Sequence, residues 1–379
     1  MPSELKPSIP IARPFLTQRE HDLVREVLDS GQLAEGSYVR QFEEAFGAAQ
    51  GLPYVVATNN GTAALHAALL AVGVRPGDKV LTTPFTFVAT ANAVLYCGAR
   101  PVFADVSPAT GNLDPQAVEE ALRADPAIRY LLVVHLYGLA APMPELMELA
   151  RRYELTVVED CAQAHLASID GQPVGSFGRA AAFSFYATKN LTTGEGGCVA
   201  STDPEVAERA RLAAHHGQTG HYFHETLGFN YRMTNVAAAI GLGQLERLEA
   251  MTEVRRANAA YYDATLAGHS LQVPVAPPGY RHVYHQYTLR VPGPDDQRRD
   301  RLAAYLKEEG IGAAVHYPRP LTRQPSLAGR FDVAGGGELP AAEELAAQVL
   351  SIPVHPLVGP EERERVAEAI LRWEEEDLR

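Results

Sequence analysis

The chain has 379 residues, 46% of them hydrophobic, which is enough to bury the core of one large domain and a smaller one. Its 33 Lys and Arg against 46 Asp and Glu give a net charge of −13, which argues against nucleic acid or an anionic membrane as the main partner. The three cysteines, Cys97, Cys161 and Cys198, match no CxxC spacing, so neither a disulfide framework nor a metal site is expected. No signal-peptide core and no long apolar stretch occurs, so we expect a cytoplasmic protein.

The first half of the chain predicts a mostly parallel sheet covered by helices. Residues 15–50 carry two apolar stripes typical of a pair of amphipathic helices, and 54–58 form a short apolar strand before the turn NNGT and an alanine-rich helix. Strands are then predicted at 79–84, 100–106, 130–138 and 156–160, separated by helices at 86–98, 114–123 and 143–154. Such alternation is the pattern of an α/β domain.

The second half of the chain has a different order of predicted elements. A helix is predicted at 204–217, then a long polar and aromatic loop at 217–235, then an uninterrupted helix from about 236 to 266. From about 270, proline-rich turns alternate with short strands and helices, which indicates a smaller α+β domain. We therefore divide the chain into a large domain at 1–255 and a small C-terminal domain at 256–379.

The segment FSFYATKNLTTGEGG (183–197) carries the main chemical signal. An alternating aromatic strand delivers Lys189 into a turn of Thr and Gly, with no helical salt-bridge pattern to hold the amine in solvent. A free lysine has a pKa of about 10.4 and is a poor nucleophile at neutral pH, and burial or condensation with an aldehyde cofactor removes that obstacle. A surface lysine in a glycine loop is the alternative.

Two other positions suit charged groups of a ligand, one a cationic group and the other a phosphate. Asp160 ends a buried strand, where a carboxylate needs a charge partner such as a protonated pyridine nitrogen; it could instead cap the next helix. Gly61 and Thr62 open a helix directly after a strand, the arrangement in which unpaired N–H groups meet a phosphate, although a plain capped helix has the same pattern.

Five segments resemble the DegT/DnrJ/EryC1/StrS family of sugar aminotransferases, which are fold-type-I enzymes using pyridoxal phosphate (PLP). They are NNGTAAL, TPFTFVATANAV, VVEDCAQAHLA, FSFYATKNLTTGEGG and NYRMTNVAAAIGLGQL, in this order. The resemblance extends from IPIARP near the start to VHYPRPL near residue 320. The lysine segment and EDCAQAH are specific to it, whereas NGT alone is not.

The resemblance implies roles for the residues around the cofactor ring. Lys189 would form the internal aldimine and later shuttle a proton, and Asp160 would pair with the pyridine nitrogen. Gln163 would pack near the phenolic oxygen, and Phe87 would stack on the ring's other face.

The phosphate cradle implied by the resemblance consists of Gly61, Thr62 and Ser184, with a backbone contact from Ala63. Asn235 would reach the same phosphate from the neighbouring subunit. The active site would then be complete only in a homodimer, with the 217–235 loop at the interface.

Other residues have a weaker connection to the site. His316 and Tyr317 would approach the substrate, or pack as a turn pair under the small domain. Arg232 would contact a substrate diphosphate, or form an interface ion pair. His165 would lie beside the cofactor, or satisfy the turn after EDCAQ.

We therefore expect an aminotransferase that moves an amino group, from L-glutamate by resemblance, to C3 or C4 of a nucleotide-linked keto sugar through PLP and its amine form, pyridoxamine phosphate (PMP). Three alternatives stay open: a PLP-dependent sugar dehydratase, an aminotransferase of a cyclitol or other cyclic ketone, and a non-catalytic regulatory protein. Dehydratases of this family carry a histidine at the lysine position, where this chain has Lys189. A regulatory protein would be expected to lose Lys189 or Asp160.

Overall fold

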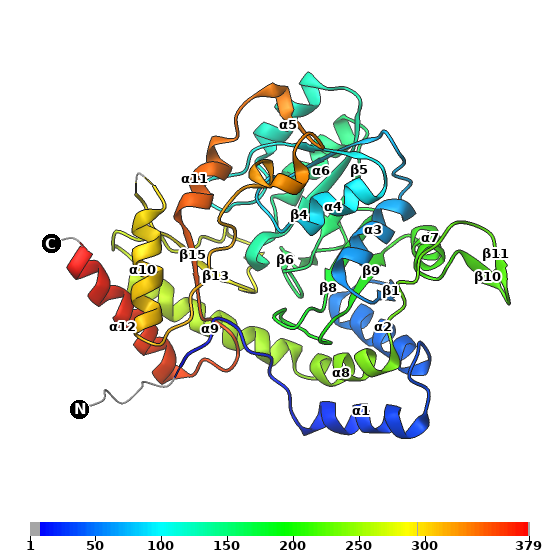
Figure 1. Cartoon of the computed structure of the whole chain (residues 1–379), viewed down its shortest axis with the longest axis horizontal. Helices are drawn as coiled ribbons and strands as arrows, with labels where there is room; N and C mark the ends of the chain where they lie inside the picture. The colour runs from blue at the N-terminus through cyan, green and yellow to red at the C-terminus, as the bar shows by residue number, and fades with distance from the viewer. Residues whose placement is uncertain (1–7, 294, 378–379) are drawn as a thin grey trace.

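An eight-stranded sheet forms the centre of the computed structural model, which describes residues 8–293 and 295–377 (Figure 1). The strand order is β1-β9-β8-β5-β4-β2-β3-β14. Its strands are β1 (Tyr54–Thr58), β2 (Lys79–Thr82), β3 (Arg100–Phe103), β4 (Ile128–Val134), β5 (Thr156–Asp160), β8 (Ala180–Ser184), β9 (Gly197–Ser201) and β14 (Asp332–Val333). Only β9 is antiparallel to its neighbours, so the predicted mostly parallel sheet is confirmed.

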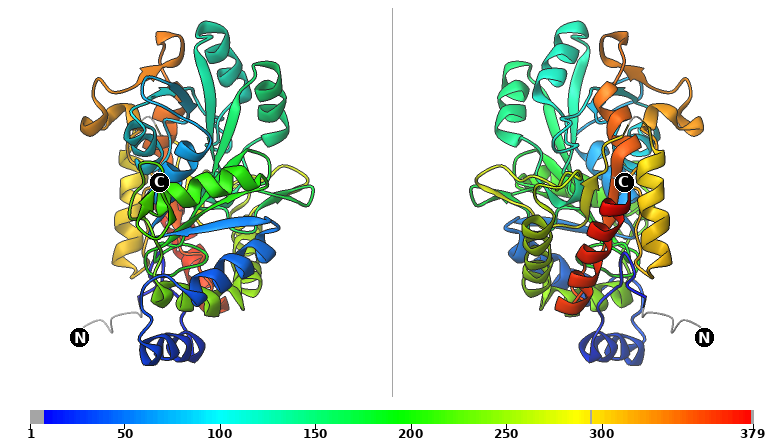
Figure 2. Two further views of the ribbon diagram at one scale, coloured as in Figure 1. Left: turned by 90° about the vertical axis from the view of Figure 1, so that its right-hand side faces the viewer. Right: turned by 90° about the vertical axis from the view of Figure 1, so that its left-hand side faces the viewer.

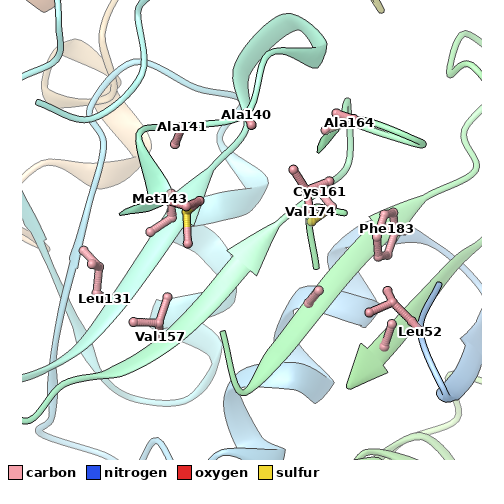
Figure 3. Close-up of a cluster of buried hydrophobic side chains, with 14 of the residues drawn as sticks. Leu52, Leu131, Ala140, Ala141, Met143, Val157, Cys161, Ala164, Val174 and Phe183 are labelled. Carbon is pink, nitrogen blue, oxygen red and sulfur yellow. The ribbon is translucent and has the colours of Figure 1, made fainter. Parts of the chain in front are cut away.

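Helices cover both faces of this sheet. One face carries α3 (Gly61–Ala71), α4 (Ala89–Tyr96) and α7 (Pro204–Ala214), and the other carries α2 (Ser37–Gln50), α5 (Pro115–Ala124), α6 (Met143–Arg152) and α8 (Asn235–Leu245). Successive strand residues point to opposite faces, so Val157 joins one apolar cluster and Val158 the other. Figure 3 shows Val157 with Leu131 and Phe183, from three strands, in the first of these clusters.

The helix pair predicted at the N-terminus is confirmed by α1 (Gln18–Ser30) and α2. Thr17 begins α1 with a capping box, in which its side chain bonds the helix backbone and Glu20 bonds the Thr17 backbone. Asp114 caps α5, with Pro115 at the first helical position, as its sequence predicts.

The uninterrupted helix expected from 236 to 266 is wrong. The chain turns after α8, and α9 (Leu248–Leu266) begins three residues later, with Arg247 at φ −125° and ψ 1° between them. The Arg247 guanidinium donates to the buried carboxylate of Glu20 at 2.5 Å, and this bond to α1 holds the break in place. The apolar pattern continues across the break, and for that reason the sequence does not mark it.

The loop expected at 217–235 contains a short hairpin, β10 (Gln218–Gly220) and β11 (Phe223–His224), which projects from the body of the molecule (Figure 1). It leaves three large apolar side chains exposed, with 83% of Tyr222, 62% of Phe223 and 85% of Leu227 accessible.

The C-terminal part has its own core, as expected of a small α+β domain. It contains α9, α10 (Gln297–Glu308), α12 (Pro360–Asp377) and the antiparallel pair β13 (Tyr287–Arg290) and β15 (Val349–Ile352). Figure 2 shows α10 and α12 lying side by side. The division at 255/256 falls inside α9 and stays a prediction.

Several segments of the C-terminal part return to the large domain. β14 adds to the edge of the main sheet beside β3, and β12 (Tyr280–Arg281) pairs with β6 (Ser168–Ile169), whose other neighbour is β7 (Gln172–Pro173). α11 (Pro340–Gln348) packs against residues after β2 and β4. The remaining short helical turns are η1 (Leu136–Gly138), η2 (Leu321–Arg323), η3 (Pro325–Leu327) and η4 (Ala334–Gly336). Within the described residues, no helix has the length and apolarity to cross a bilayer.

Candidate active site

The strand ends that the sequence singled out meet at one edge of the sheet. β1, β5 and β8 run in the same direction, so the start of α3 after β1, Asp160 at the end of β5 and Lys189 after β8 come to the same side. Ligands of open α/β sheets bind beyond such carboxyl ends.

Asp160 is a buried acid without a cationic partner. Its side chain points toward α4, where Thr90 Oγ1 donates to Oδ2 at 2.9 Å, and the N–H of Ala162 donates to Oδ1 at 3.2 Å. Burial raises the pKa of this carboxyl, while the two hydrogen bonds and the charge of Lys189 oppose the rise. No ion pair within 4 Å links Asp160 to a basic side chain in the described part of the chain. A cationic ligand atom could therefore form an ion pair with this carboxyl, whose position is already fixed by two hydrogen bonds.

Lys189 lies in the turn after β8, where its N–H donates to the carbonyl of Tyr186 at 2.9 Å. Burial lowers the pKa of its amine to about 8, against an opposing effect of Asp160. The same amine lowers the pKa of His165, His285 and His316, so all three lie within its electrostatic reach. A fully solvated surface lysine does not fit these surroundings.

The start of α3 is built for close approach. A Cβ on Gly61 would lie 2.6 Å from Cβ and 2.9 Å from Oγ of Ser184, so only glycine allows this contact. The first N–H groups of a helix, here those of Gly61 and Thr62, have no intrahelical acceptor. With Ser184 beside them, they form a small pocket of donors suited to a phosphate.

The backbone contact expected of Ala63 stays a prediction, and its N–H has a partner within the helix cap. Its N–H donates to Oδ1 of Asn60, the N-cap residue of α3, at 2.8 Å. A phosphate contact at Ala63 would therefore compete with the bond that begins the helix.

One wall of the site is a hydrogen-bonded group from three distant segments. Gln163 accepts from the N–H of Tyr137 at 2.6 Å, and its Nε2 donates to the hydroxyl of Tyr317 at 3.1 Å. Tyr137 has a left-handed backbone with φ 59°, and its hydroxyl donates to the carbonyl of His316. Next to this group, Phe87 is 57% exposed with its ring centroid 6.4 Å from that of Tyr317, and a flat ligand would cover its open face.

His316 and Tyr317 thus lie in the site rather than beneath the small domain alone. His316 Nδ1 is 2.9 Å from Oγ of Ser351, and burial together with the charge of Lys189 lowers its pKa to about 4. Burial raises the pKa of the Tyr317 hydroxyl, so both side chains are neutral near pH 7.

His165, for which two positions were open, is enclosed in the core. Its ring lies against Phe46, Phe183 and Phe185, with centroids 5.7 to 6.3 Å away. Burial lowers its pKa to about 3, so it contributes a neutral ring behind the lysine turn.

Asn235 is hydrogen-bonded within its own chain, and its role at a partner's phosphate stays a prediction. It is 1% exposed, and its side chain donates to the carbonyl of Gln32 at 2.8 Å and accepts from the N–H of Val39 at 3.3 Å in the same chain. The amide fastens α8 to the segment between α1 and α2, and reaching a partner's phosphate would break both bonds.

Arg232 is not brought together with His316 and Tyr317. It is exposed beside the hairpin, and its Nε donates to Oδ1 of Asn230 at 3.2 Å. It lines a polar cavity of about 350 Å³ with His215, Gln218, Thr219 and Gly220.

A buried trio behind Asp160 has the composition of a metal site but is already hydrogen-bonded. His135, Glu159 and Cys161 place ligand atoms within 4.8 Å of one another. His135 Nε2 lies 2.9 Å from Glu159, whose carboxylate also accepts N–H groups from residues 175, 177 and 178. The trio ties the turn after β7 to the sheet.

Sequence reasoning missed Thr90, Tyr137, His285 and Ser351. Thr90 and Tyr137 stand at strand ends or in quoted motifs, so their position was a usable signal. His285 contacts Asn190 at 3.3 Å, and Ser351 lies within β15; neither has a local pattern that could have marked it.

Comparison with known proteins agrees with this geometry. The model of the DegT/DnrJ/EryC1/StrS aminotransferase family matches residues 14–371. The chain is 41% identical to the pleiotropic regulatory protein of Geobacillus stearothermophilus over 92% of each chain. It is 38% identical to the UDP-N-acetyl-3-dehydro-alpha-D-glucosamine 3-aminotransferase of Acidithiobacillus ferrooxidans over 97% of each.

Among solved structures, S. venezuelae DesV in complex with a ketimine intermediate superposes with a TM-score of 0.91 at 38% identity, covering 98% of this chain and 99% of that one. Other similar solved structures are the PLP-form and the PMP-form of the sugar aminotransferase Spr1654 from Streptococcus pneumoniae. The unpaired buried acid, the lysine of lowered pKa and the glycine-lined helix start fit that cofactor's pyridine nitrogen, aldehyde and phosphate. The chain belongs to the DegT/DnrJ/EryC1/StrS family of PLP-dependent aminotransferases.

Proposed function

We propose that this protein transfers an amino group from L-glutamate to C3 or C4 of a nucleotide-linked keto sugar. The observation that carries the proposal is that Lys189 and the buried Asp160, which forms no ion pair within the described residues, lie at the same edge of the sheet. Support for the substrate class comes from relatives named for UDP-, GDP- and dTDP-linked sugars, which are 36 to 40% identical to this chain over 93 to 97% of it.

When bound, PLP accepts the electron pair of the carbon that loses a proton and carries the amino group between the two substrates. Lys189 would hold the cofactor and then move that proton, since an amine with a pKa of about 8 can both give and take it near neutrality. Asp160 would keep the pyridine nitrogen protonated. The N–H groups of Gly61 and Thr62 and the hydroxyl of Ser184 would bind the phosphate.

Three more residues would orient the reacting parts. Phe87 and Gln163 would lie against the cofactor ring. Gln163 is locked between the backbone of Tyr137 and the hydroxyl of Tyr317, so its amide cannot rotate without losing a bond. Such fixed partners hold reacting atoms in place at no cost during the reaction.

We also propose a homodimer in which the hairpin β10–β11 contributes to the interface. Exposed Tyr222, Phe223 and Leu227 form an apolar surface that a second copy would cover. Replacing all three by Ser should shift the sedimentation coefficient from dimer to monomer, whereas a dimer unchanged by these substitutions would remove the hairpin from the interface.

The function is tested by supplying PLP, glutamate and a panel of UDP-, GDP- and dTDP-linked 3- and 4-keto sugars, and detecting the amino sugar by mass spectrometry. Lys189→Ala should lose turnover and the visible absorption of the bound cofactor. Lys307→Ala, on α10, should retain both. Full activity in Lys189→Ala would refute the assignment.

The same assay separates the alternatives. A dehydratase would release a deoxy sugar without a new amine, and an enzyme for cyclic ketones would ignore every nucleotide sugar yet react with glutamate. One relative is named as a regulatory protein. A purely regulatory chain would show no glutamate-driven change in cofactor absorption.

A further inference from the structure

Two buried hydroxyl groups connect His316 to the strand pair β13–β15. His316 Nδ1 lies 2.9 Å from Oγ of Ser351, and Ser351 Oγ lies 2.9 Å from Oγ1 of Thr288. Thr288 and Ser351 are directly opposite each other in the β13–β15 pair, whose strands run side by side in Figure 1. Both residues are buried, so neither hydroxyl has ready access to solvent.

The two hydrogen bonds that link Thr288, Ser351 and His316 can run in either direction along the row. In the first, Thr288 donates to Ser351 and Ser351 donates to Nδ1 of His316, so both hydroxyl hydrogens are used. In the second, Nδ1–H donates to Ser351 and Ser351 donates to Thr288, which leaves the Thr288 hydrogen without an acceptor in the described residues. Each direction leaves one donor without a described partner, the Nε2–H of His316 in the first and the Thr288 hydroxyl in the second. His316 is only half-buried whereas Thr288 is buried, and a buried donor left unpaired costs about as much as a lost hydrogen bond, so the first direction is favoured.

We infer that Ser351, supported by Thr288, is a positioning residue that fixes the tautomer of His316 with its hydrogen on Nε2. The imidazole is then a hydrogen-bond donor at Nε2, the ring nitrogen that does not contact Ser351, and Nε2 does not act as a base. No described residue bonds Nε2, so this N–H is open to a ligand.

The backbone of His316 is held as firmly as its ring. Its carbonyl accepts from the Tyr137 hydroxyl, and Ala314 exchanges two backbone bonds with Ser351 at 3.1 and 2.8 Å. The ring therefore has little freedom to turn toward another partner. Such an N–H suits an oxygen acceptor. The identification of this acceptor as a carbonyl or hydroxyl oxygen of the sugar rests on the proposed function.

The tautomer is measured directly with [15N]histidine-labelled holoenzyme, with His316→Gln to identify the His316 signals. We expect wild type and Thr288→Ser, which keeps the hydroxyl, to show a protonated Nε2 and an unprotonated Nδ1. Ser351→Ala should mix the two tautomers, and Ser351→Cys, whose thiol is a weaker hydrogen-bond donor than the hydroxyl, should do so in part. A protonated Nδ1 in wild type, or signals unchanged in Ser351→Ala, would overturn the inference.

Steady-state kinetics provide a second test of the role of Ser351. Ser351→Ala should lower kcat/KM for the keto sugar about tenfold, the effect of one hydrogen bond, while the half-reaction with glutamate keeps its rate. A loss confined to the glutamate half-reaction would contradict a role toward the sugar. If no keto sugar is turned over by any variant, the proposed function fails, and the tautomer measurement still decides the role of Ser351.

Discussion

The apoprotein should contain one lysine that titrates far below the others. The chain has only four lysines, Lys6, Lys79, Lys189 and Lys307, so each can be followed separately. We expect Lys189 to titrate at a pKa of about 8, because burial disfavours its charged form. Lys79 should titrate above its ordinary value, because it bonds to Asp125 at 2.5 Å.

The size of the shift can be worked out. From the ordinary 10.5 to about 8 is roughly 2.5 units, or about 3 kcal/mol at 1.36 kcal/mol per unit. This is an upper bound, since Lys189 keeps part of its surface exposed. Asp160 holds the pKa up, so Asp160→Asn should lower it further.

The assay is the 13C chemical shift of lysine Cε in [13C]lysine-labelled apoprotein between pH 6.5 and 11.5, with Lys189→Ala to identify the signal. A value at or above 10 for Lys189 would refute the argument from burial. A rise of the pKa in Asp160→Asn would refute the proposed coupling of the two residues.

The same shift has a consequence for stability. Between pH 8 and 10.5 the unfolded chain binds more protons at Lys189 than the folded one, so the free energy of unfolding should rise with pH. Urea unfolding of the apoprotein and of Lys189→Met isolates this effect, because the variant lacks it. Identical pH profiles in that range would contradict a lowered pKa in the folded state.

Three further predictions follow from single contacts. Gly61→Ala should cost about 1–3 kcal/mol of overpacking against Ser184 and weaken PLP binding, measured by urea unfolding and equilibrium dialysis; Gly337→Ala, whose nearest atom is 3.9 Å away, is the control that should change neither. Burial raises the pKa of Glu20, but hydrogen bonds from Arg247, Thr17 and Gln244 outweigh burial and lower this pKa to about 2. The stabilisation of the fold by the Glu20 carboxylate is therefore complete above about pH 4.5 and is lost as the pH falls toward 2. Between pH 5 and pH 3 the free energy of unfolding of wild type should fall by about 2 kcal/mol more than that of Glu20→Gln, and equal losses would contradict this. Thr90→Val removes the donor to Asp160 and should weaken PLP binding about tenfold, while Thr90→Ser restores it; equal affinities in the two variants would exclude a role for the hydroxyl.

The chemistry-bearing residues were predictable where the signal is local. Asp160 ends the buried strand β5, and Lys189 follows the buried strand β8 and precedes a Thr and Gly turn. Parallel strands place their carboxyl ends together, so these strand ends predict a shared site without any knowledge of the contacts.

Local patterns are insufficient where residues distant in the sequence contact one another. The role of Asn235 at a partner's phosphate stays a prediction, and in this structure its amide bonds the carbonyl of Gln32 and the N–H of Val39. The helix predicted after residue 235 breaks at Arg247, which bonds to Glu20 more than 220 residues earlier, and the apolar pattern of the helix does not indicate that bond.

The sequence by itself determined the alternation of strands and helices, the helix caps and the order of the five motifs, because each depends on neighbours a few residues away. Only the tertiary structure decided which groups share a hydrogen bond across the site, as in the contacts of Tyr137 and Ser351 with His316. A buried polar group must find a partner wherever the fold brings one, and that choice is made in space, among residues with no pattern in common along the chain.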